Sequence, residues 1–464
     1  METRRFVRLV AVVVVVLSMA TIGYGYTTTE TTAAAGAEEQ IDGAATNKQA
    51  VEPRDNITVV ATDSNTWLGE KSEGPRANAE LIAFAPNGSI LYYNDSHTRY
   101  WDVDPVQGTK TTVEYVYAQH LNESQCGGET VCTRNGVERV NLTTGELTEV
   151  YSAITAGKHS TRWHDVDRLD EDTLVVADIA EDRVYAVNTT TELIEWEWEA
   201  RSDFPPESGG PYPEDWTHLN DVEILEDGRI MVSLRNHDQV VFLDRETGLQ
   251  EDWTLGSDDD HSVLYEQHNP DYMPESEGGP AVIVADSERN RVVEYTREDD
   301  SWSKNWQWSD DRLQWPRDAD RLPNGHTLIT DSNGNRVFEI DENGEKVWSA
   351  DIAFPYEAER LGTGDESTGG SPMESGGASA GADGGDGEST ATGGESESSG
   401  EASSGLVGPN INAVMYVLPV WMGIPQLLAL IALCLTVVGW VALEWRWSKY
   451  GVALRSPVSL RSNR

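Results

Sequence analysis

The chain has 464 residues, of which 80 are Asp or Glu and 34 are Lys or Arg, giving a formal net charge of −46 at pH 7. Acidic residues are spread along the whole sequence, as is typical of proteins from extreme halophiles. Such a charge causes little self-repulsion when the Debye length is about 3 Å, as in 1 M salt. The composition argues against a nucleic-acid partner, because the sequence has no basic patch.

An apolar segment begins the chain. Arg4 and Arg5 precede an uncharged, Val-rich run, and the sequence predicts a signal peptide or an uncleaved signal anchor over residues 1–26. We favour the anchor slightly, because no small-x-small cleavage site directly follows the apolar core. Residues 27–50 are small and polar and are predicted to form a linker.

Residues 51–361 are repetitive, and their pattern predicts β-strands. Apolar runs end in Asp and are followed five residues later by Arg, in the pairs Asp178/Arg183, Asp286/Arg291 and Asp331/Arg336. Each of these pairs is predicted to form an ion pair. A fourth copy begins at Arg229, a looser fifth runs from Ser89 to Trp101, and residues 56–64 match the inner part of a sixth.

Each repeat has three or four short strands and about 45–55 residues, which is the size of a propeller blade. Asn-Gly and Asp-Gly pairs mark tight turns between the strands. We therefore predict an all-β fold, a six-bladed β-propeller over residues 51–361, with residues 347–356 completing the ring. Seven blades are the alternative.

One repeat is lengthened near residues 105–135, and this insertion carries Cys126 and Cys132. Two cysteines close together outside the cell predict a disulfide. Neither a metal ion nor a cofactor is predicted.

The C-terminal part predicts a membrane tether. Residues 362–410 are almost purely Gly, Ser, Glu, Ala and Thr and are predicted to be a disordered stalk. A transmembrane segment is predicted over 411–445, with its best helix after Pro425, and a basic cytoplasmic tail over 446–464. Positive residues outside both apolar segments place both termini in the cytoplasm and the propeller on the extracellular side of the cell membrane. Asn-x-Ser/Thr sequons agree with that location, at Asn56, Asn87, Asn94, Asn122, Asn141 and Asn188.

Four similar phrases precede strand-like runs and indicate a functional site. They are Trp163-His-Asp-Val, Trp216-Thr-His-Leu-Asn-Asp-Val, Glu266-Gln-His-Asn-Pro-Asp and Trp315-Pro-Arg-Asp. In a propeller, the stretch entering each innermost strand borders the central channel. The shared position is predicted to hold Asn78, His164, Asn220, His268 and Arg317, with His218 two residues before Asn220 and Arg235 after the following strand.

Imidazoles and guanidinium groups at one channel mouth suit an anion. Arg offers a donor fork for oxyanions, and a neutral imidazole can attack or carry protons near pH 7. The alternative is that these side chains only connect one blade to the next by hydrogen bonds.

The ordered series Trp216-Thr-His-Leu-Asn-Asp-Val, Ser233-Leu-Arg, Trp253-Thr-Leu-Gly and Gln267-His-Asn resembles the motifs of the arylsulfate sulfotransferase family, in a haloarchaeal form. The resemblance covers residues 80–360. It implies a propeller enzyme that transfers a sulfuryl group from an aryl sulfate donor to a phenolic acceptor without a nucleotide sulfate donor.

The resemblance also implies residue roles. His268 would take the sulfuryl group covalently, His218 and Arg235 would hold the sulfate oxygens, and His164 would assist proton transfer. Arg317 and Asn220 are added as substrate-binding residues from the repeat register alone.

Two other functions stay open at this point. One is a non-catalytic propeller that binds a surface glycan, peptide or protein. The other is a metal-dependent propeller hydrolase such as a lactonase, for which Asn78, Asn220 and Asp318 offer oxygen ligands.

Overall fold

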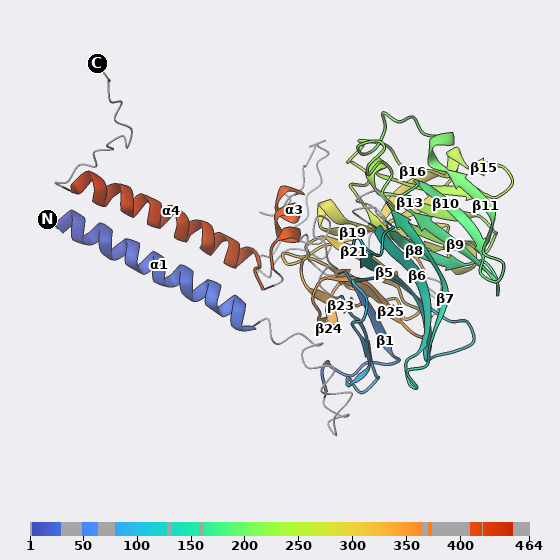
Figure 1. Cartoon of the computed structure of the whole chain (residues 1–464), viewed down its shortest axis with the longest axis horizontal. Coiled ribbons are helices and arrows are strands. Elements are labelled where there is room, and N and C mark those ends of the chain that lie inside the picture. The colour runs from blue at the N-terminus through green and yellow to red at the C-terminus, as the bar shows by residue number, and fades with distance from the viewer. Residues whose placement is uncertain are drawn as a thin grey trace, which may run out of the picture. The chain divides into compact units, whose positions relative to one another are not determined.

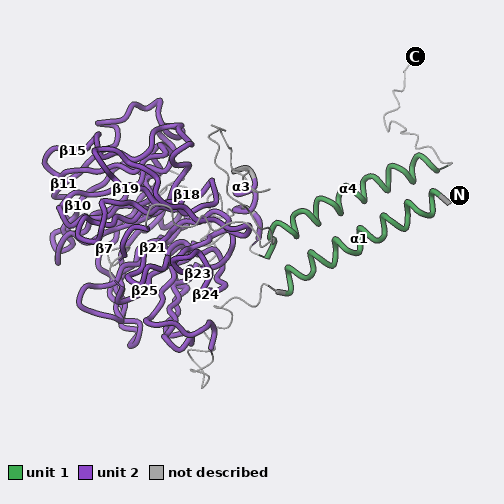
Figure 2. The backbone as a smooth tube through the Cα atoms, turned by 180° about the vertical axis from the view of Figure 1, so that it is seen from behind, with its two compact units in different colours: residues 1–30, 421–464 green, residues 31–420 purple. Residues whose placement is uncertain are grey.

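The computed structural model describes residues 2–28, 49–63, 79–127, 132–156, 162–363, 370–373, 409–419 and 421–448. The chain divides into two compact units, one formed by residues 1–30 and 421–464 and the other by residues 31–420 (Figure 2). The larger unit is a six-bladed β-propeller, as predicted (Figure 1). The predicted stalk and cytoplasmic tail lie largely outside the described residues.

Each blade is an antiparallel sheet. Four-stranded blades are formed by β4 (Arg99–Pro105), β5 (Thr112–Leu121), β6 (Cys132–Asn141) and β7 (Leu147–Ala156), and by β8 (Trp163–Arg168), β9 (Thr173–Asp178), β10 (Arg183–Asn188) and β11 (Leu193–Glu199). The next blade contains β12 (Leu219–Ile224), β13 (Ile230–Leu234), β14 (Gln239–Asp244), β15 (Gly248–Leu249) and β16 (Leu255–Gly256). It is followed by β17 (His268–Met273), β18 (Ala281–Asp286), β19 (Arg291–Glu298) and β20 (Ser301–Trp308), and by β21 (Pro316–Arg321), β22 (Thr327–Asp331), β23 (Arg336–Ile340) and β24 (Lys346–Asp351).

The sixth blade joins the two ends of the propeller sequence. Its innermost strand is β25 (Pro355–Arg360), which pairs with β1 (Thr58–Thr62), followed by β2 (Leu81–Phe84) and β3 (Ile90–Asn94). Thr58 lies opposite Arg360 in this pairing. Antiparallel hydrogen bonds between the first and last strands therefore close the ring.

Residues 58–62 form the second strand of the closing blade, in agreement with their predicted place in the inner part of a sixth repeat, and β25 occupies the channel side. The closing blade corrects two other details of the predicted repeats. The looser copy from Ser89 to Trp101 is divided between two blades, with β3 outermost in one and β4 innermost in the next. The strand near residue 347 is β24, the outer strand of the preceding blade, so only the last part of residues 347–356 enters the closing blade.

The middle strands of the blades are apolar because both of their faces pack against neighbouring blades. Val175, Val176 and Ala177 on β9 are fully buried, although they alternate between the two faces of the sheet. Val and Ile suit such strands because branched side chains pack well on a pleated surface.

Trp residues on the outer strands connect consecutive blades. The indole N–H of Trp196 donates to the Arg245 carbonyl at 3.0 Å, and that of Trp308 donates to the Gly344 carbonyl at 3.1 Å. Trp348 repeats the contact at the ring closure, where it donates to the Glu52 carbonyl at 2.8 Å. These contacts give the repeated Trp positions a structural role.

The predicted Asp–Arg pairs are confirmed. Register places each Asp directly opposite its Arg at the β9–β10, β18–β19 and β22–β23 turns. The guanidinium Nε atoms donate to the carboxylates at 3.0, 2.5 and 2.7 Å, in the pairs Arg183–Asp178, Arg291–Asp286 and Arg336–Asp331. The predicted disulfide between Cys126 and Cys132 is also present, in the β5–β6 hairpin.

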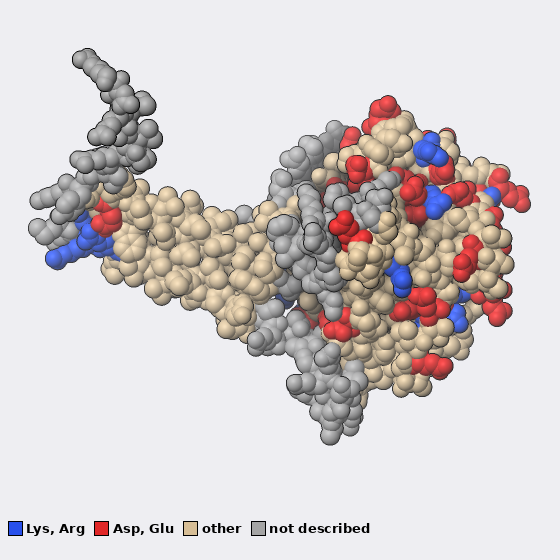
Figure 3. Space-filling model, viewed as in Figure 1, with Lys and Arg blue, Asp and Glu red and all other residues tan. Residues whose placement is uncertain are grey.

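The smaller unit contains α1 (Glu2–Thr28) and α4 (Ile424–Trp447), two helices long and apolar enough to cross a membrane. They pack antiparallel, since Arg8 pairs with Glu444 at 2.5 Å near one end and Tyr26 contacts Trp421 near the other. Most of their visible surface carries no charged side chain, whereas acidic side chains dominate the visible charge of the propeller (Figure 3). A short helix, α3 (Pro409–Val417), belongs to the larger unit.

Candidate functional site

Sheet register gives the innermost strands a common position at the channel mouth. Val166 faces Val176, Val222 faces Val232 and Ala319 faces Ile329 on the adjacent second strands, which aligns β8, β12 and β21. β17 aligns in the same way, with Pro270 at the aligned position. Two residues before the aligned position, β8, β12, β17 and β21 carry His164, Asn220, His268 and Arg317, respectively. Trp101 and Tyr356 occupy that place on β4 and β25, whereas Asn78 lies outside the described residues.

Irregular backbone precedes and accompanies this position. The register shifts at the start of β4, β8, β12, β17 and β21, which is the signature of a bulge in each innermost strand. His218, Glu266 and Trp315 have φ values of 45°, 46° and 58°, although none is glycine. Left-handed backbone at non-glycine residues is strained and gathers at functional sites.

His268 is buried, and its hydrogen bond fixes its tautomer. Its Nδ1 lies 2.8 Å from Ser287 Oγ, and Ser287 Oγ also lies 2.7 Å from the Pro316 carbonyl oxygen. The carbonyl can only accept, so the hydroxyl donates to it and accepts from His268 Nδ1–H. His268 Nε2 therefore carries the lone pair. Burial lowers the pKa of His268 well below its ordinary value, and the charges of Arg317 and Arg235 lower it further.

His164 is held against the aromatic side of the mouth. Its ring stacks on Trp101 with centroids 4.2 Å apart, and its Nδ1 lies 2.9 Å from the Tyr356 hydroxyl. Burial lowers the pKa of His164 well below its ordinary value, helped by His218. Its Nε2 is buried and has no hydrogen-bond partner within the described residues. A buried polar atom without a partner is costly, which indicates a place for a ligand or water.

His218 and Arg235 are each oriented by a carboxylate. The His218 ring centroid lies 5.3 Å from that of His164, and its Nδ1 lies 2.7 Å from Asp215 Oδ1. Burial lowers the pKa of His218, Arg235 lowers it further and Asp215 opposes both. Arg235 begins the 3₁₀ turn after β13, and its Nη2 donates to Glu266 Oε2 at 2.7 Å.

Arg317 and Asn220 each use one side-chain atom in a hydrogen bond and leave another without a partner among the described residues, Nε in Arg317 and Oδ1 in Asn220. Arg317 Nη1 donates to Asp63 at 3.0 Å, its guanidinium stacks on Tyr356 at 4.7 Å, and its Nε has no partner among the described residues. Asn220 uses its Nδ2 to donate to the Gln267 carbonyl at 3.0 Å, a contact between blades. The structure therefore brings the three histidines and both arginines together, because His268 interacts electrostatically with Arg317, Arg235 and His218.

Sequence reasoning missed several members of this cluster. Arg162 stacks over Trp101 at 5.6 Å and acts electrostatically on both His164 and His218. The sequence predicts Tyr356 only as part of the ring closure, although it occupies the same repeat position as His164. Ser287 had a usable signal, because it follows its strand directly, as Arg235 does in the blade before.

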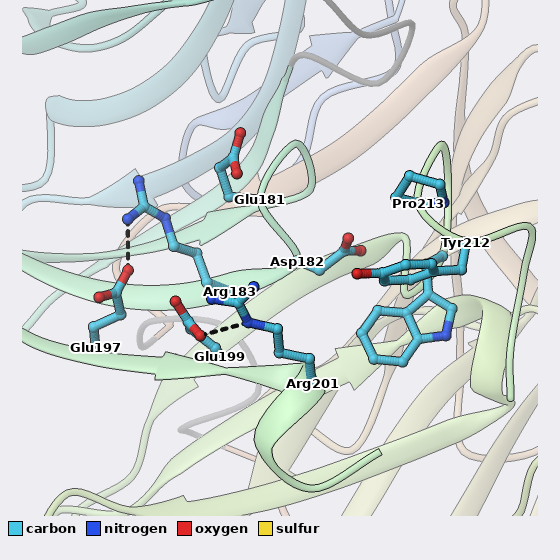
Figure 4. A pocket seen from close by; sticks show the side chains of 9 residues that line it. Glu181, Asp182, Arg183, Glu197, Glu199, Arg201, Tyr212 and Pro213 are labelled. Atoms are coloured by element: carbon cyan, nitrogen blue, oxygen red, sulfur yellow. Dashed lines mark hydrogen bonds and ion pairs between the residues drawn. The ribbon is translucent and has the colours of Figure 1, made fainter. Parts of the chain in front are cut away.

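The pocket in Figure 4 is lined by none of the histidines or arginines that gather at the channel mouth. It is bounded by Glu181, Asp182, Arg183, Glu197, Glu199, Arg201, Tyr212, Pro213 and Trp216. Arg183 pairs with Glu197, and Arg201 pairs with Glu199. Its cations are already neutralised, and none of the clustered histidines lines it.

Fold and site together define a six-bladed propeller whose channel mouth presents imidazole and guanidinium groups. Residues 143–353 match the sequence model of the arylsulfotransferase (ASST) family, a range that contains the three histidines and both arginines. Residues 143–353 are therefore similar to the arylsulfotransferase family, and they form part of a six-bladed β-propeller.

Other comparisons are more distant. No curated protein matches the chain. Similar solved structures include a protein of unknown function from Bacteroides caccae, with 12% identity, a TM-score of 0.45, and coverage of 65% of this chain and 97% of that chain. The periplasmic gluconolactonase of Pseudomonas aeruginosa has 13% identity, a TM-score of 0.40, and coverage of 66% and 99%. These scores are too low to support a functional argument.

Proposed function

We propose that this protein transfers a sulfuryl group from an aryl sulfate to a phenol through a sulfohistidine formed on His268. The observation that carries the proposal is the meeting of a neutral, oriented imidazole with Arg235, Arg317 and His218 at one channel mouth. The family match supports the same reaction class.

The first half-reaction needs a nucleophile and a leaving group. The His268 Nε2 lone pair forms the N–S bond while the bond from sulfur to the aryl oxygen breaks, and the phenolate leaves with that electron pair. The ring becomes cationic as the N–S bond forms. The hydrogen bond from Nδ1–H to Ser287 Oγ then becomes charge-assisted, which favours the intermediate.

The sulfate oxygens need donors throughout this step. Arg235 and Arg317 supply fixed positive charge, and His218 is oriented by Asp215. Donors that are held in place before the reaction stabilise charge without reorganising, and one such donor is worth about 10²–10³ in rate. Because both arginines also contact carboxylates, their guanidinium planes are held in one orientation.

The second half-reaction returns the enzyme to its starting state. A phenol oxygen attacks sulfur, the S–N bond breaks, and its electron pair returns to His268 Nε2. The phenol proton passes to His164 Nε2, which has no other partner among the described residues, and is then released to the first phenolate or to water, which restores the neutral imidazole. Its lowered pKa keeps His164 unprotonated, and therefore able to accept the proton, at neutral pH.

We further propose that the propeller works outside the cell on a membrane anchor. Two helices satisfy the length and composition of membrane spans. They pack antiparallel, so Arg4 and Arg8 in the first turns of α1 come to the same end of the pair as Arg446 in the last turn of α4. The positive-inside rule then assigns that end to the cytoplasm and the propeller to the opposite side.

The test is covalent labelling of the detergent-solubilised full chain with a ³⁵S-labelled aryl sulfate in the absence of acceptor. We expect one labelled histidine at position 268, identified by peptide mass spectrometry, and loss of label on adding a phenol. His268→Asn should abolish the label and lower sulfuryl transfer by about 10³-fold or more. His326→Asn, which lies in the β21–β22 hairpin and contacts Glu339, is the control and should retain both. Full activity in His268→Asn would refute the proposed nucleophile.

A further inference from the structure

Acidic residues line the propeller channel at two positions beyond the histidine site. One residue after the mouth position, the six innermost strands carry Asp102, Asp165, Asp221, Asn269, Asp318 and Glu357, and three residues after it they carry Asp104, Asp167, Glu223, Asp271, Asp320 and Glu359. All twelve belong to innermost strands, and the carboxylates act on one another across blades, as Asp318 does on Glu357. This concentration of like charge needs neutralisation inside the fold.

Much of the first ring has a structural partner in the next blade. Asp165 Oδ2 accepts the Val222 N–H at 2.6 Å, and Glu357 Oε1 accepts the Val103 N–H at 2.8 Å. Asp318 Oδ2 likewise accepts the Ala358 N–H at 3.1 Å. In each case a carboxylate of one blade receives the backbone of the blade beside it.

The pattern fails at Asp221. The residue at the receiving position of the next blade is Pro270, which has no N–H to donate. Asp221 Oδ2 is consequently buried without a partner, in a side chain that is only 4% exposed and acts electrostatically on Asp271. Asp320 Oδ2 is also buried without a partner, and no Arg, Lys or His in the described parts of the chain forms an ion pair with Asp320.

Asp320 belongs to a cluster of three buried carboxylates. Asp271, Asp318 and Asp320 each offer one oxygen, and these atoms lie within 4.8 Å of one another. Calcium binds oxygens at about 2.3–2.6 Å, so its ligand oxygens can stand up to about 5.2 Å apart. Each pair of these oxygens is therefore close enough to bind one calcium ion without rearrangement of the strands. Magnesium demands a near-ideal octahedral arrangement and dehydrates reluctantly, so it is expected to bind more weakly.

We propose that Asp271, Asp318 and Asp320 bind a calcium ion in the propeller channel, with Asp221 beside them as additional negative charge. The ion would connect β17 to β21, the two innermost strands that carry His268 and Arg317. It would stabilise the wall that holds these two residues without touching the substrate. The inference is independent of the sulfuryl-transfer proposal, because its readout is metal content and stability.

The experiment uses the detergent-solubilised full chain, prepared with EGTA in about 2 M KCl to suppress loose binding at the acidic surface. Titration with CaCl₂ should give about one tightly bound Ca²⁺ per chain by equilibrium dialysis and elemental analysis. It should also raise Tm by about 5 °C at free Ca²⁺ about 100-fold above Kd. MgCl₂ at the same concentration should give a smaller shift.

Asp320→Asn is the informative variant, because it preserves the shape of the side chain and removes the charge of a carboxylate whose Oδ2 has no hydrogen-bond partner among the described residues. It should lose the bound Ca²⁺ and the Ca²⁺-dependent rise in Tm. Asp299→Asn makes the same chemical change in an exposed turn at φ 47°, which Asn tolerates, and should behave as wild type.

Two results would overturn the proposal. One is a wild-type chain that binds no stoichiometric Ca²⁺, whether or not the variant folds. The other is Asp320→Asn binding Ca²⁺ as tightly as wild type, which would assign the bound metal to the surface. If Tm in EGTA instead falls from pH 5 to pH 8 and Ca²⁺ does not restore it, shared protons and not calcium neutralise the channel.

Discussion

At the scale of single residues, Ser287 has two functions that the fold allows to be separated. Its hydroxyl donates to the Pro316 carbonyl, and Ser332 makes the equivalent contact one blade later, where it donates to the Pro355 carbonyl at 2.6 Å. Only Ser287 also accepts a histidine N–H. The same contact between blades is thus used in one place to orient a proposed nucleophile.

We expect Ser287→Ala to lower kcat/KM for sulfuryl transfer by about 10- to 100-fold, since a hydrogen bond to a charged group is worth about 1.5–3 kcal/mol. Ser332→Ala loses the matching contact between blades and is the control for stability. Both variants should show similar decreases in Tm, while only Ser287→Ala slows transfer and the formation of labelled His268. Equal activity in the two variants would show that Ser287 is structural only.

The site residues were predictable from sequence where they occupy the same position in each repeat. His164, Asn220, His268 and Arg317 could be assigned to one position because the phrases repeat in sequence. Asp215, Glu266 and Arg162 could not, because they lie in loops of different length and conformation that only the folded chain brings together. The channel carboxylates were visible as repeated Asp in the phrases, but their convergence depends on a ring that sequence spacing does not reveal.

At the scale of elements, α3 lies against the site. Asn412 Nδ2 donates to Glu288 Oε2 at 3.1 Å, beside Ser287, and the Tyr416 ring contacts Trp315 with centroids 5.3 Å apart. Trp315 in turn lies edge-on to His268 at 5.8 Å. Since His268 is buried, α3 is expected to restrict access of bulky donors.

Replacing Asn412 and Tyr416 together by Ala should therefore raise kcat/KM for a bulky aryl sulfate by about 5- to 10-fold. Destabilising the position of α3 over the site by about 1 kcal/mol would raise the fraction of molecules with an open site by about this factor. Transfer rates for a small and a bulky donor measure this directly. Val414→Ala, at an exposed position of the same helix, should leave the ratio unchanged. Decreased activity with both donors would show that α3 forms part of the substrate site.

The blades were predicted best where each copy is continuous in sequence. The closing blade was misassigned because its strands come from both ends of the propeller region. A prediction from the local sequence pattern assigns β3 and β4 to one blade. The turn between them instead joins two different blades. Only the pairing of β25 with β1 resolves this.

At the scale of the whole molecule, the net charge of −46 should make stability depend on salt. Lowering KCl from about 2 M to about 0.01 M lengthens the Debye length to about 30 Å, so acidic side chains across the surface repel one another. We expect Tm to fall steadily over that range, monitored by Trp fluorescence. Replacing KCl with sucrose should not restore it. A Tm independent of KCl would show that self-repulsion is balanced within the fold.

The position of β25 in the ring also sets the order in which the protein can mature. Its Tyr356 meets His164, and its Glu357 accepts the Val103 N–H, so the last propeller strand to be synthesised contacts blades made much earlier. A chain synthesised only as far as residue 354 has an open ring and a histidine site without its tyrosine. The complete histidine site can therefore assemble only after synthesis of the last propeller strand.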